Sequence, residues 1–196
     1  MHWTAPVTER SLRVAVVGVG HVGRHHARIL SSLAGVELVA TVDIDEGRAL
    51  KSARGTSAKA ETNVEALEGR VDAAIVAVPT KNHLEVAEPL LNAGIPVLVE
   101  KPIASNLAEA DEMLAVAAHS GTCLAVGHTE RFNPALTTAL PLVDKPRFIE
   151  VHRLGAYPSR SLDIDVVFDV MIHDLDVILD VLDSDVVSIE AVGVPI

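Results

Sequence analysis

The chain has 196 residues, of which 49% are hydrophobic and 22% are charged. This is enough to bury one sizeable core and part of a second, and it excludes a mainly disordered chain, because so much apolar side chain can offset the loss of chain entropy. The formal net charge is −11, and no Lys or Arg follows Arg160. Without a basic stripe, nucleic acid is disfavoured as a partner.

The sequence gives no sign of a membrane partner or a secretory leader. No apolar run approaches the roughly 20 uncharged residues that a membrane helix needs. Residues 1–13 lack the apolar stretch of a signal peptide. The single cysteine, Cys123, excludes an intrachain disulfide and a Cys-based zinc site, and we expect it to be a buried small hydrophobe. A reducing compartment, the cytoplasm, is predicted.

Short apolar runs alternate with helical patterns through the first two thirds of the chain. The run at 72–78 is almost entirely apolar, as in a strand that is covered on both faces. Strands are predicted at 13–17, 37–42, 72–78, 96–99 and 123–126, and helices at 21–33, around 48–53, at 83–92 and at 107–119, the last two stopped by Gly94 and Gly121. This alternation indicates an α/β fold with a doubly wound parallel sheet of the Rossmann type.

The alternation of predicted strands and helices stops after Gly127, so we predict a first domain at 1–127 and a second at 128–196. The second is expected to begin an α+β domain with a mainly antiparallel sheet, with strands at 148–154 and 186–194 and a helix at 166–182. Three elements form only a thin layer, and its stability would be marginal without further packing. We therefore expect either a longer natural chain or a partner that covers this piece.

The stretch GVGHVG follows the first strand and opens a helix, which is the context of a dinucleotide-binding turn. Gly18 permits the tight turn, Gly20 lets the backbone approach a pyrophosphate, and Gly23 lets helix and strand pack closely. Asp43 lies 20 residues further, where a carboxylate accepts both ribose hydroxyls and repels a 2′-phosphate, so NAD is favoured over NADP. The preference for NAD is moderate, because Arg48 could accommodate a 2′-phosphate. The alternative is an ordinary glycine turn that binds no dinucleotide.

Three histidines flank this turn. The start of the helix, at His21 and Val22, is predicted to offer backbone N–H groups to the pyrophosphate. His25 and His26 are predicted to lie on the helix surface.

Four segments in order resemble the Gfo/Idh/MocA family of oxidoreductases. They are PVLVEKPIA at 96–104, VPTKNH at 78–83, GHTERFNP at 127–134 and DVMIHDLD at 169–176. The resemblance implies a Rossmann domain followed by a domain with a large open antiparallel sheet, which usually makes homo-oligomers. The segment GHTERFNP, followed by RFIEVHRL at 147–154, is most similar to the branch of the family that oxidises the 3-hydroxyl of UDP-N-acetylhexosamines.

The resemblance also implies roles for residues at the end of two strands. Lys101 would hydrogen-bond the reacting hydroxyl and the nicotinamide ribose, and Glu100 would orient or neutralise it. Pro79, Thr80 and His83 would border the cofactor. The alternative for Lys101 is a surface lysine paired with a carboxylate.

Asp169 and His173 are four residues apart on one predicted helix and so share a face. A carboxylate beside an imidazole increases its basicity and fixes its tautomer. By resemblance, His173 would accept the sugar proton and Asp169 would contact the substrate. Two alternatives are a solvated acidic face and a metal site formed with Asp176, although we predict no metal.

Arg131 and Asn133 are predicted to border the sugar or its phosphates, since an arginine fork binds phosphate oxygens in pairs. His128 and Arg153 are weaker candidates, with a structural hydrogen bond or a surface charge as the equal alternative. The predicted function is an oxidoreductase that transfers a hydride from a sugar hydroxyl to NAD. The alternatives are a non-catalytic dinucleotide-binding module, a dehydrogenase of a free sugar or inositol, and a metal-dependent hydrolase.

Overall fold

The computed structural model describes residues 10–154, 165–182 and 184–194. Most of the amino-terminal stretch considered for a leader lies outside these residues. The chain divides into two compact units, residues 1–127 and 128–196, and each is described by itself. In the part of the chain that the structure describes, no helix is both long and apolar enough to cross a membrane.

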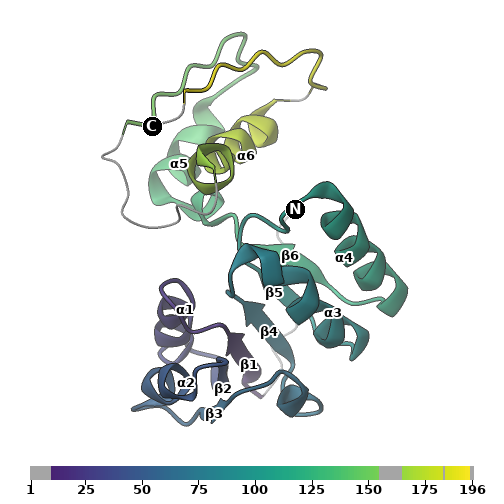
Figure 1. Ribbon diagram of the computed structural model, residues 1–196. Helices are drawn as coiled ribbons and strands as arrows, with labels where there is room; N and C mark the ends of the chain where they lie inside the picture. The colour runs from purple at the N-terminus through teal and green to yellow at the C-terminus, as the bar shows by residue number, and fades with distance from the viewer. Residues whose placement is uncertain (1–9, 155–164, 183, 195–196) are drawn as a thin grey trace. The chain divides into compact units, whose positions relative to one another are not determined.

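Unit 1 is built on a six-stranded sheet in the order β3-β2-β1-β4-β5-β6, with every neighbouring pair parallel (Figure 1). This order, with its reversal between β1 and β4, is that of the doubly wound Rossmann fold, so the predicted fold class of this part is confirmed. The strands are β1 (Leu12–Val17), β2 (Val36–Val42), β3 (Lys59–Glu61), β4 (Ala73–Val76), β5 (Val97–Val99) and β6 (Leu124–Val126).

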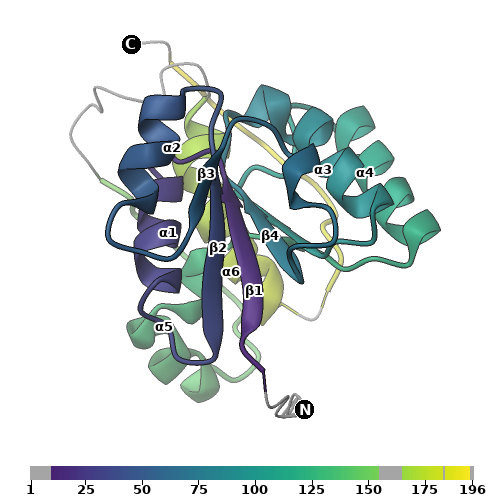
Figure 2. The ribbon, with the colours of Figure 1, turned by 90° about the horizontal axis from the view of Figure 1, so that it is seen from below.

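Helices cover both faces of this sheet. Figure 2 shows α1 and α2 on one face and α3 and α4 on the other. Successive residues of β1 are buried on opposite faces: Val16 packs in the cluster of α1, and Ala15 and Val17 pack in the larger cluster of α3 and α4. The helices are α1 (Gly23–Leu30), α2 (Glu46–Ala53), α3 (His83–Asn92) and α4 (Leu107–Ser120), with short 3₁₀ turns at Glu65–Leu67 and Thr80–Asn82.

Local side chains define the ends of the longest helix, α4. Asn106 accepts a hydrogen bond from the backbone N–H of Glu109, and the Glu109 carboxylate accepts from the N–H of Ser105, the residue before the N-cap, in a variant of the capping box. The helix ends at Gly121, whose φ of 64° suits glycine, and Gly94 follows α3 with a φ of 73°. Both predicted stops are confirmed.

One strand of unit 1 is absent from the predicted elements, and the prediction for Cys123 is wrong. The three-residue strand β3 is not predicted, because Lys-Ala-Glu carries no apolar run. Cys123 is exposed rather than buried, since it immediately precedes β6, the edge strand of the sheet.

Unit 2 is helical over the residues that the structure describes. Its elements are a 3₁₀ turn at Thr129–Phe132, α5 (Pro134–Ala139), a 3₁₀ turn at Leu140–Leu142, a π-helical turn at Val167–Met171 and α6 (Ile172–Val181). The single predicted helix at 166–182 is therefore a π turn that leads into an α-helix.

The strands predicted at 148–154 and 186–194 are absent from this unit. Both segments run without regular structure, and Phe148, Val187 and Val192 are largely exposed. A strand is stabilised by a ladder partner and by a layer over its apolar face, and the described residues offer these segments neither. The antiparallel sheet of a second domain thus stays a prediction.

Candidate functional site

The glycine turn lies at the carboxyl end of β1, next to the point where the strand order reverses. Gly18 has a φ of 82°, and a Cβ there would lie 2.7 Å from the backbone of Ala77. A Cβ on Gly23 would lie 1.8 Å from the Gly18 carbonyl oxygen. At Gly20, by contrast, no heavy atom lies within 4 Å of the built Cβ. Two glycines are required by the protein itself, and the third leaves the backbone open to a ligand.

This arrangement fits a dinucleotide. Helix α1 begins at Gly23, three residues after the open Gly20, so the positive end of its dipole lies at the glycine turn. Inside the helix, the Arg24 and His25 N–H groups already donate to the carbonyls of Gly20 and Val22. Val22 is the residue before the helix, and His21 is exposed with its ring against His25. A pyrophosphate held here needs no charged side chain from the turn.

Asp43 follows β2 and is only 8% exposed. Its Oδ2 accepts a hydrogen bond from the Val19 N–H of the glycine turn at 3.1 Å. Its Oδ1 accepts from the Asp45 N–H at 3.0 Å and from Arg48, whose Nη2 lies 2.9 Å away. The carboxylate therefore supports the turn as well as lying at the position expected for ribose recognition, and Arg48 partly neutralises it.

The residues after β4 divide into two groups. Pro79 is exposed and Thr80 is half-buried in the turn that follows the strand, so both keep surface that a ligand can reach. His83 is 1% exposed, with Nδ1 3.0 Å from the Pro102 carbonyl and Nε2 3.0 Å from the Val78 carbonyl. The ring of His83 thus holds the loop after β4 against the loop after β5, and its position beside the cofactor stays a prediction.

Glu100 lies directly after β5, and three neighbours surround its carboxylate. His26 Nε2 lies 2.7 Å from Oε1, and the Lys101 N–H donates to Oε2 at 3.2 Å. The third neighbour is Gly127, where an added Cβ would lie 3.3 Å from the carboxylate. The prediction of a surface position for His26 is wrong, since this residue faces the sheet from α1.

The charge of Glu100 is stabilised by these contacts. Burial acts to raise the pKa of Glu100, but the hydrogen bond and positive field of His26, together with Lys101, outweigh burial and leave the pKa below its usual value. Lys101 is half-buried beside it, at the carboxyl end of the parallel sheet, where such sheets bind ligands.

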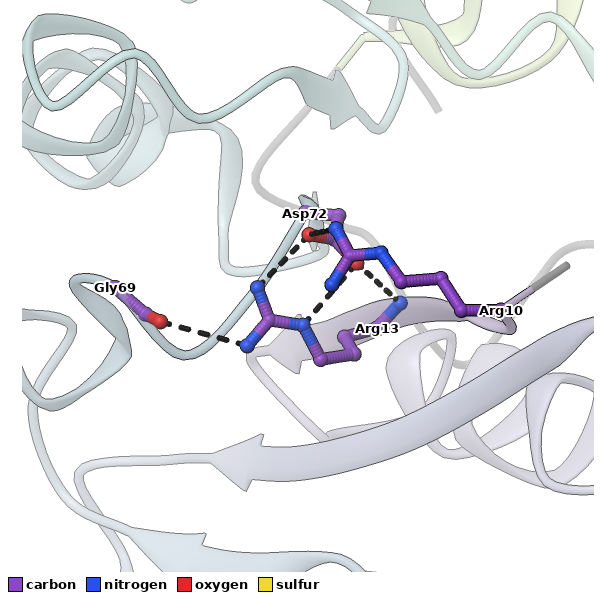
Figure 3. Close-up of polar contacts among 4 residues, drawn as sticks. All are labelled: Arg10, Arg13, Gly69 and Asp72. Carbon is purple, nitrogen blue, oxygen red and sulfur yellow. Dashed lines mark hydrogen bonds and ion pairs between the residues drawn. The ribbon is translucent and has the colours of Figure 1, made fainter. Parts of the chain in front are cut away.

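A second carboxylate, Asp72, lies at the opposite end of the sheet. Figure 3 shows Arg10 and Arg13 converging on it, with an arginine nitrogen of each 2.9 Å from Oδ1. The Arg13 N–H also donates to Oδ2 at 2.9 Å. The hydrogen bonds from Arg13 hold the pKa of Asp72 far below its usual value, against the effect of burial. This cluster joins the start of β1 to the start of β4.

In unit 2, Asp169 lies in the π turn and His173 in the first turn of α6. Both side chains are half-buried. π turns inside helices occur frequently at functional sites, because they break the regular hydrogen-bond ladder. Lys101 belongs to unit 1, so the structure describes it separately from this pair.

Three carboxylates of α6 have arginine partners that sequence reasoning missed. Arg131 binds Asp176 at 2.8 Å and Asp180 at 2.6 Å, and Arg153 binds Asp174 at 2.7 Å. The hydrogen bond from Arg131 lowers the pKa of Asp176 against the effect of burial, and the positive fields of His128 and His173 contribute.

Two predicted substrate residues have structural contacts in unit 2, and their contact with the sugar or its phosphates stays a prediction. The fork of Arg131 holds Asp176 of α6 in a bidentate ion pair. Asn133 caps α5, because its side-chain oxygen accepts from the Ala135 N–H while its amide donates to Glu130. His128 Nδ1 lies 3.8 Å from Asp176, which is beyond hydrogen-bond distance, and Arg153 is the ion-pair partner of Asp174. The role of either residue toward a substrate stays a prediction.

Two hollows of unit 1 lie away from the glycine turn. One, of about 110 Å³, lies beside α3 and is lined by Val64, Pro89 and Leu90 among others. The other, of about 270 Å³, includes Ser11, Glu37 and Thr56. Within the described ranges, no three His, Cys, Asp or Glu side chains are arranged to hold a metal ion.

The fold and the glycine turn define unit 1 as a dinucleotide-binding domain of the Rossmann class. The profile of the GFO/IDH/MocA oxidoreductase family, described by its NAD-binding Rossmann fold, matches residues 12–128. The chain therefore belongs to this oxidoreductase family, and unit 1 is its NAD-binding domain.

Known relatives agree with this assignment. The chain is 38% identical to a UDP-N-acetylglucosamine 3-dehydrogenase of Acidithiobacillus ferrooxidans over 93% of its own length and 58% of the relative's. A crystal structure of that enzyme superposes with a TM-score of 0.88 at 37% identity, covering 95% of this chain and 61% of the other. An inositol 2-dehydrogenase of Acidothermus cellulolyticus is 32% identical over 95% of this chain and 58% of its own. The chain thus spans less than two thirds of these relatives.

Proposed function

We propose that the protein is an NAD-dependent dehydrogenase of a nucleotide sugar, which oxidises the 3-hydroxyl of a UDP-N-acetylhexosamine. One observation carries the proposal: α1, which opens at the glycine turn, also reaches Glu100 beside Lys101 through His26. A phosphate-binding turn and a lysine suited to a reacting hydroxyl therefore belong to one packed unit. The similarity to the Acidithiobacillus enzyme supports the choice of sugar.

Oxidation of a carbinol removes a hydride from carbon and a proton from oxygen, and a C=O bond forms. The chemistry that NAD supplies when bound is acceptance of the hydride. The chain's own residues have the other tasks. The Lys101 ammonium would hydrogen-bond the hydroxyl and stabilise the developing alkoxide, His173 would accept the proton, and Asp169 would contact the sugar. Glu100 would keep the lysine oriented.

The test is turnover by the protein with NAD and a panel of UDP-N-acetylglucosamine, UDP-N-acetylgalactosamine, free N-acetylglucosamine and myo-inositol, followed by absorbance of NADH. We expect the UDP sugars to be oxidised with the highest kcat/KM. Preference for inositol would favour the second candidate, a polyol dehydrogenase, which the similarity to inositol 2-dehydrogenase supports. Tight NAD binding with no turnover of any substrate would indicate the non-catalytic module.

The role of His173 has its own test. Neutral imidazole is needed to take the proton, so oxidation should rise with pH through the range in which imidazoles lose theirs. His173→Ala should lower kcat by about 10²- to 10⁴-fold and remove this dependence. A chelator should have no effect on the wild type. A pH profile that His173→Ala leaves unchanged would assign the base elsewhere.

We also propose that the full protein works in the cytoplasm as a homo-oligomer. The single cysteine and the family resemblance support these two points. Sedimentation of the protein at several concentrations measures the oligomeric state, and a monomer throughout would contradict it.

A further inference from the structure

We propose that His26 is a positioning residue: through Glu100 it holds the backbone of Lys101 in place and couples it to the glycine turn. The inference rests on the proposed function, because it assigns to Lys101 the contact with the reacting hydroxyl. No motif in the sequence joins these residues. His26 and Glu100 lie 74 positions apart, and only packing brings them together.

The first step is the geometry of the pair. His26 Nε2 lies 2.7 Å from Glu100 Oε1, with side chains 21% and 13% exposed. At this distance and burial, the hydrogen bond is short and little exposed to competing water. A half-buried carboxylate that loses such a partner pays the cost of desolvation without compensation, so Glu100 depends on His26 for its place.

The second step leads from Glu100 to Lys101. The other carboxylate oxygen, Oε2, accepts the backbone N–H of Lys101 at 3.2 Å. The face of the carboxylate lies against Gly127, where an added Cβ would lie 3.3 Å away. The carboxylate of Glu100 is therefore in contact on three sides, with His26, the Lys101 N–H and Gly127, and in this position it holds the backbone of Lys101. If His26 is removed, the carboxylate can swing, and the Lys101 backbone loses a fixed acceptor.

The third step links this contact to the cofactor-binding turn. His26 follows Gly23 by one helical turn in α1, and Gly23 is fixed against Gly18 by close backbone packing. A movement of the turn is therefore transmitted through a short, rigid piece of helix to Glu100. His26 thereby fixes the position of Lys101 relative to the glycine turn.

The experiment compares three variants of the protein. His26→Leu removes the donor and keeps an apolar side chain of similar bulk, His26→Gln keeps a side-chain N–H donor, and His25→Leu is the control, since His25 is exposed on the same helix. Circular dichroism establishes that each variant is folded. The two measurements are hydrogen exchange of the Lys101 backbone amide, and kcat and KM with NAD and UDP-N-acetylglucosamine.

We expect His26→Leu to lower kcat by about 10- to 100-fold, the size of effect that misplaced catalytic groups produce, while KM for NAD changes by less than about threefold. The Lys101 amide should exchange about tenfold faster or more, because it has lost a fixed acceptor. His26→Gln should recover most of both properties, and His25→Leu should match the wild type.

Several outcomes would overturn the proposal. If His26→Leu leaves both kcat and the exchange rate of the Lys101 amide unchanged, His26 does not position Lys101. A loss confined to NAD affinity, with full kcat at saturation, would show that it serves the glycine turn alone. If His26→Leu does not fold, His26→Gln decides, since a kcat as low as that of Lys101→Ala would contradict donor-based positioning. If the wild type oxidises no sugar, the proposed function fails, and exchange of the Lys101 amide then tests the coupling by itself.

Discussion

The two ends of the parallel sheet in unit 1 both carry a buried or half-buried carboxylate, but they surround it differently. At the amino end, Asp72 is bound by two arginines and by the backbone of Arg13. At the carboxyl end, Glu100 has a histidine and one N–H, and a lysine follows it. At the amino end, two arginines are engaged with one carboxylate, and the cluster joins β1 to β4. The carboxyl end combines a lysine, a carboxylate and a glycine with open space around its built Cβ, which are the groups that we propose to meet the cofactor and the reacting hydroxyl.

The largest expected effect comes from removing the lysine at the carboxyl end. Lys101→Ala should lower kcat by about 10²-fold or more, the usual size of a charge-stabilising or acid–base contribution. NAD affinity, measured by calorimetry, should change far less, because the phosphate contacts belong to the glycine turn. Lys51→Ala, on the exposed face of α2, is the control. Normal turnover by Lys101→Ala would remove this residue from the mechanism.

Two glycine variants separate the needs of the fold from the needs of the ligand. Gly23→Ala should destabilise the protein by about 1–3 kcal/mol or more, because its Cβ would lie 1.8 Å from the Gly18 oxygen. Gly20→Ala should change stability by less than about 0.5 kcal/mol, yet weaken NAD binding about tenfold or more, because only the ligand approaches there. Thermal unfolding and calorimetry give both values. Equal destabilisation by the two variants would contradict this division.

Asp43 is expected to set the nucleotide preference. The wild type should bind NAD(H) more tightly than NADP(H), and Asp43→Ala should narrow the difference by about tenfold, the effect of one polar contact to a ribose. Asp43→Asn removes the charge but keeps an oxygen for the Val19 N–H, so it should narrow the difference with less loss of stability. Tighter binding of NADP(H) to the wild type would show that the carboxylate does not face the 2′ position.

The smallest effect is expected at the amino end. Asp72→Asn should lower the free energy of unfolding at neutral pH by about 1–2 kcal/mol, with no effect on kcat. Because folding lowers the pKa of Asp72, its contribution is full above about pH 4, where an unfolded aspartate is ionised. The contribution declines as the pH falls toward the folded pKa. Denaturation of both forms between pH 2 and 7 measures this, with exposed Asp111→Asn as the control. If the difference in free energy of unfolding between the wild type and Asp72→Asn grew as the pH fell, folding would not lower the pKa of Asp72.

Much of unit 1 is predictable because its signals are local. The glycines at 18, 20 and 23 specify their turn through backbone sterics, and the apolar runs of β1 and β4 specify buried strands through composition alone. The pairs His26–Glu100 and Arg13–Asp72 are not predictable in this way, because they join residues 74 and 59 positions apart that only packing brings together.

The structural contacts of two predicted site residues have the same physical origin. The burial of His83 depends on how the loops after β4 and β5 meet over its ring. The fork of Arg131 binds Asp176 and Asp180, which lie 45 and 49 residues further along the chain, so no local pattern predicts these pairs. In unit 2, the helix around 172–181 followed from its pattern, whereas a strand at 186–194 requires neighbours that the pattern does not supply.

The hydrogen bond from the Val19 N–H to Asp43 has an evolutionary consequence. The carboxylate that is expected to set nucleotide choice also supports the glycine turn, so this expectation implies that the two properties cannot change independently at this position. A lineage that shifts toward NADP through Ala or Gly gives up the acceptor in the same step. Asn keeps an oxygen at the same position as the acceptor, so it is the residue through which a change of nucleotide would retain support of the turn, with Arg48 already beside it to meet a phosphate.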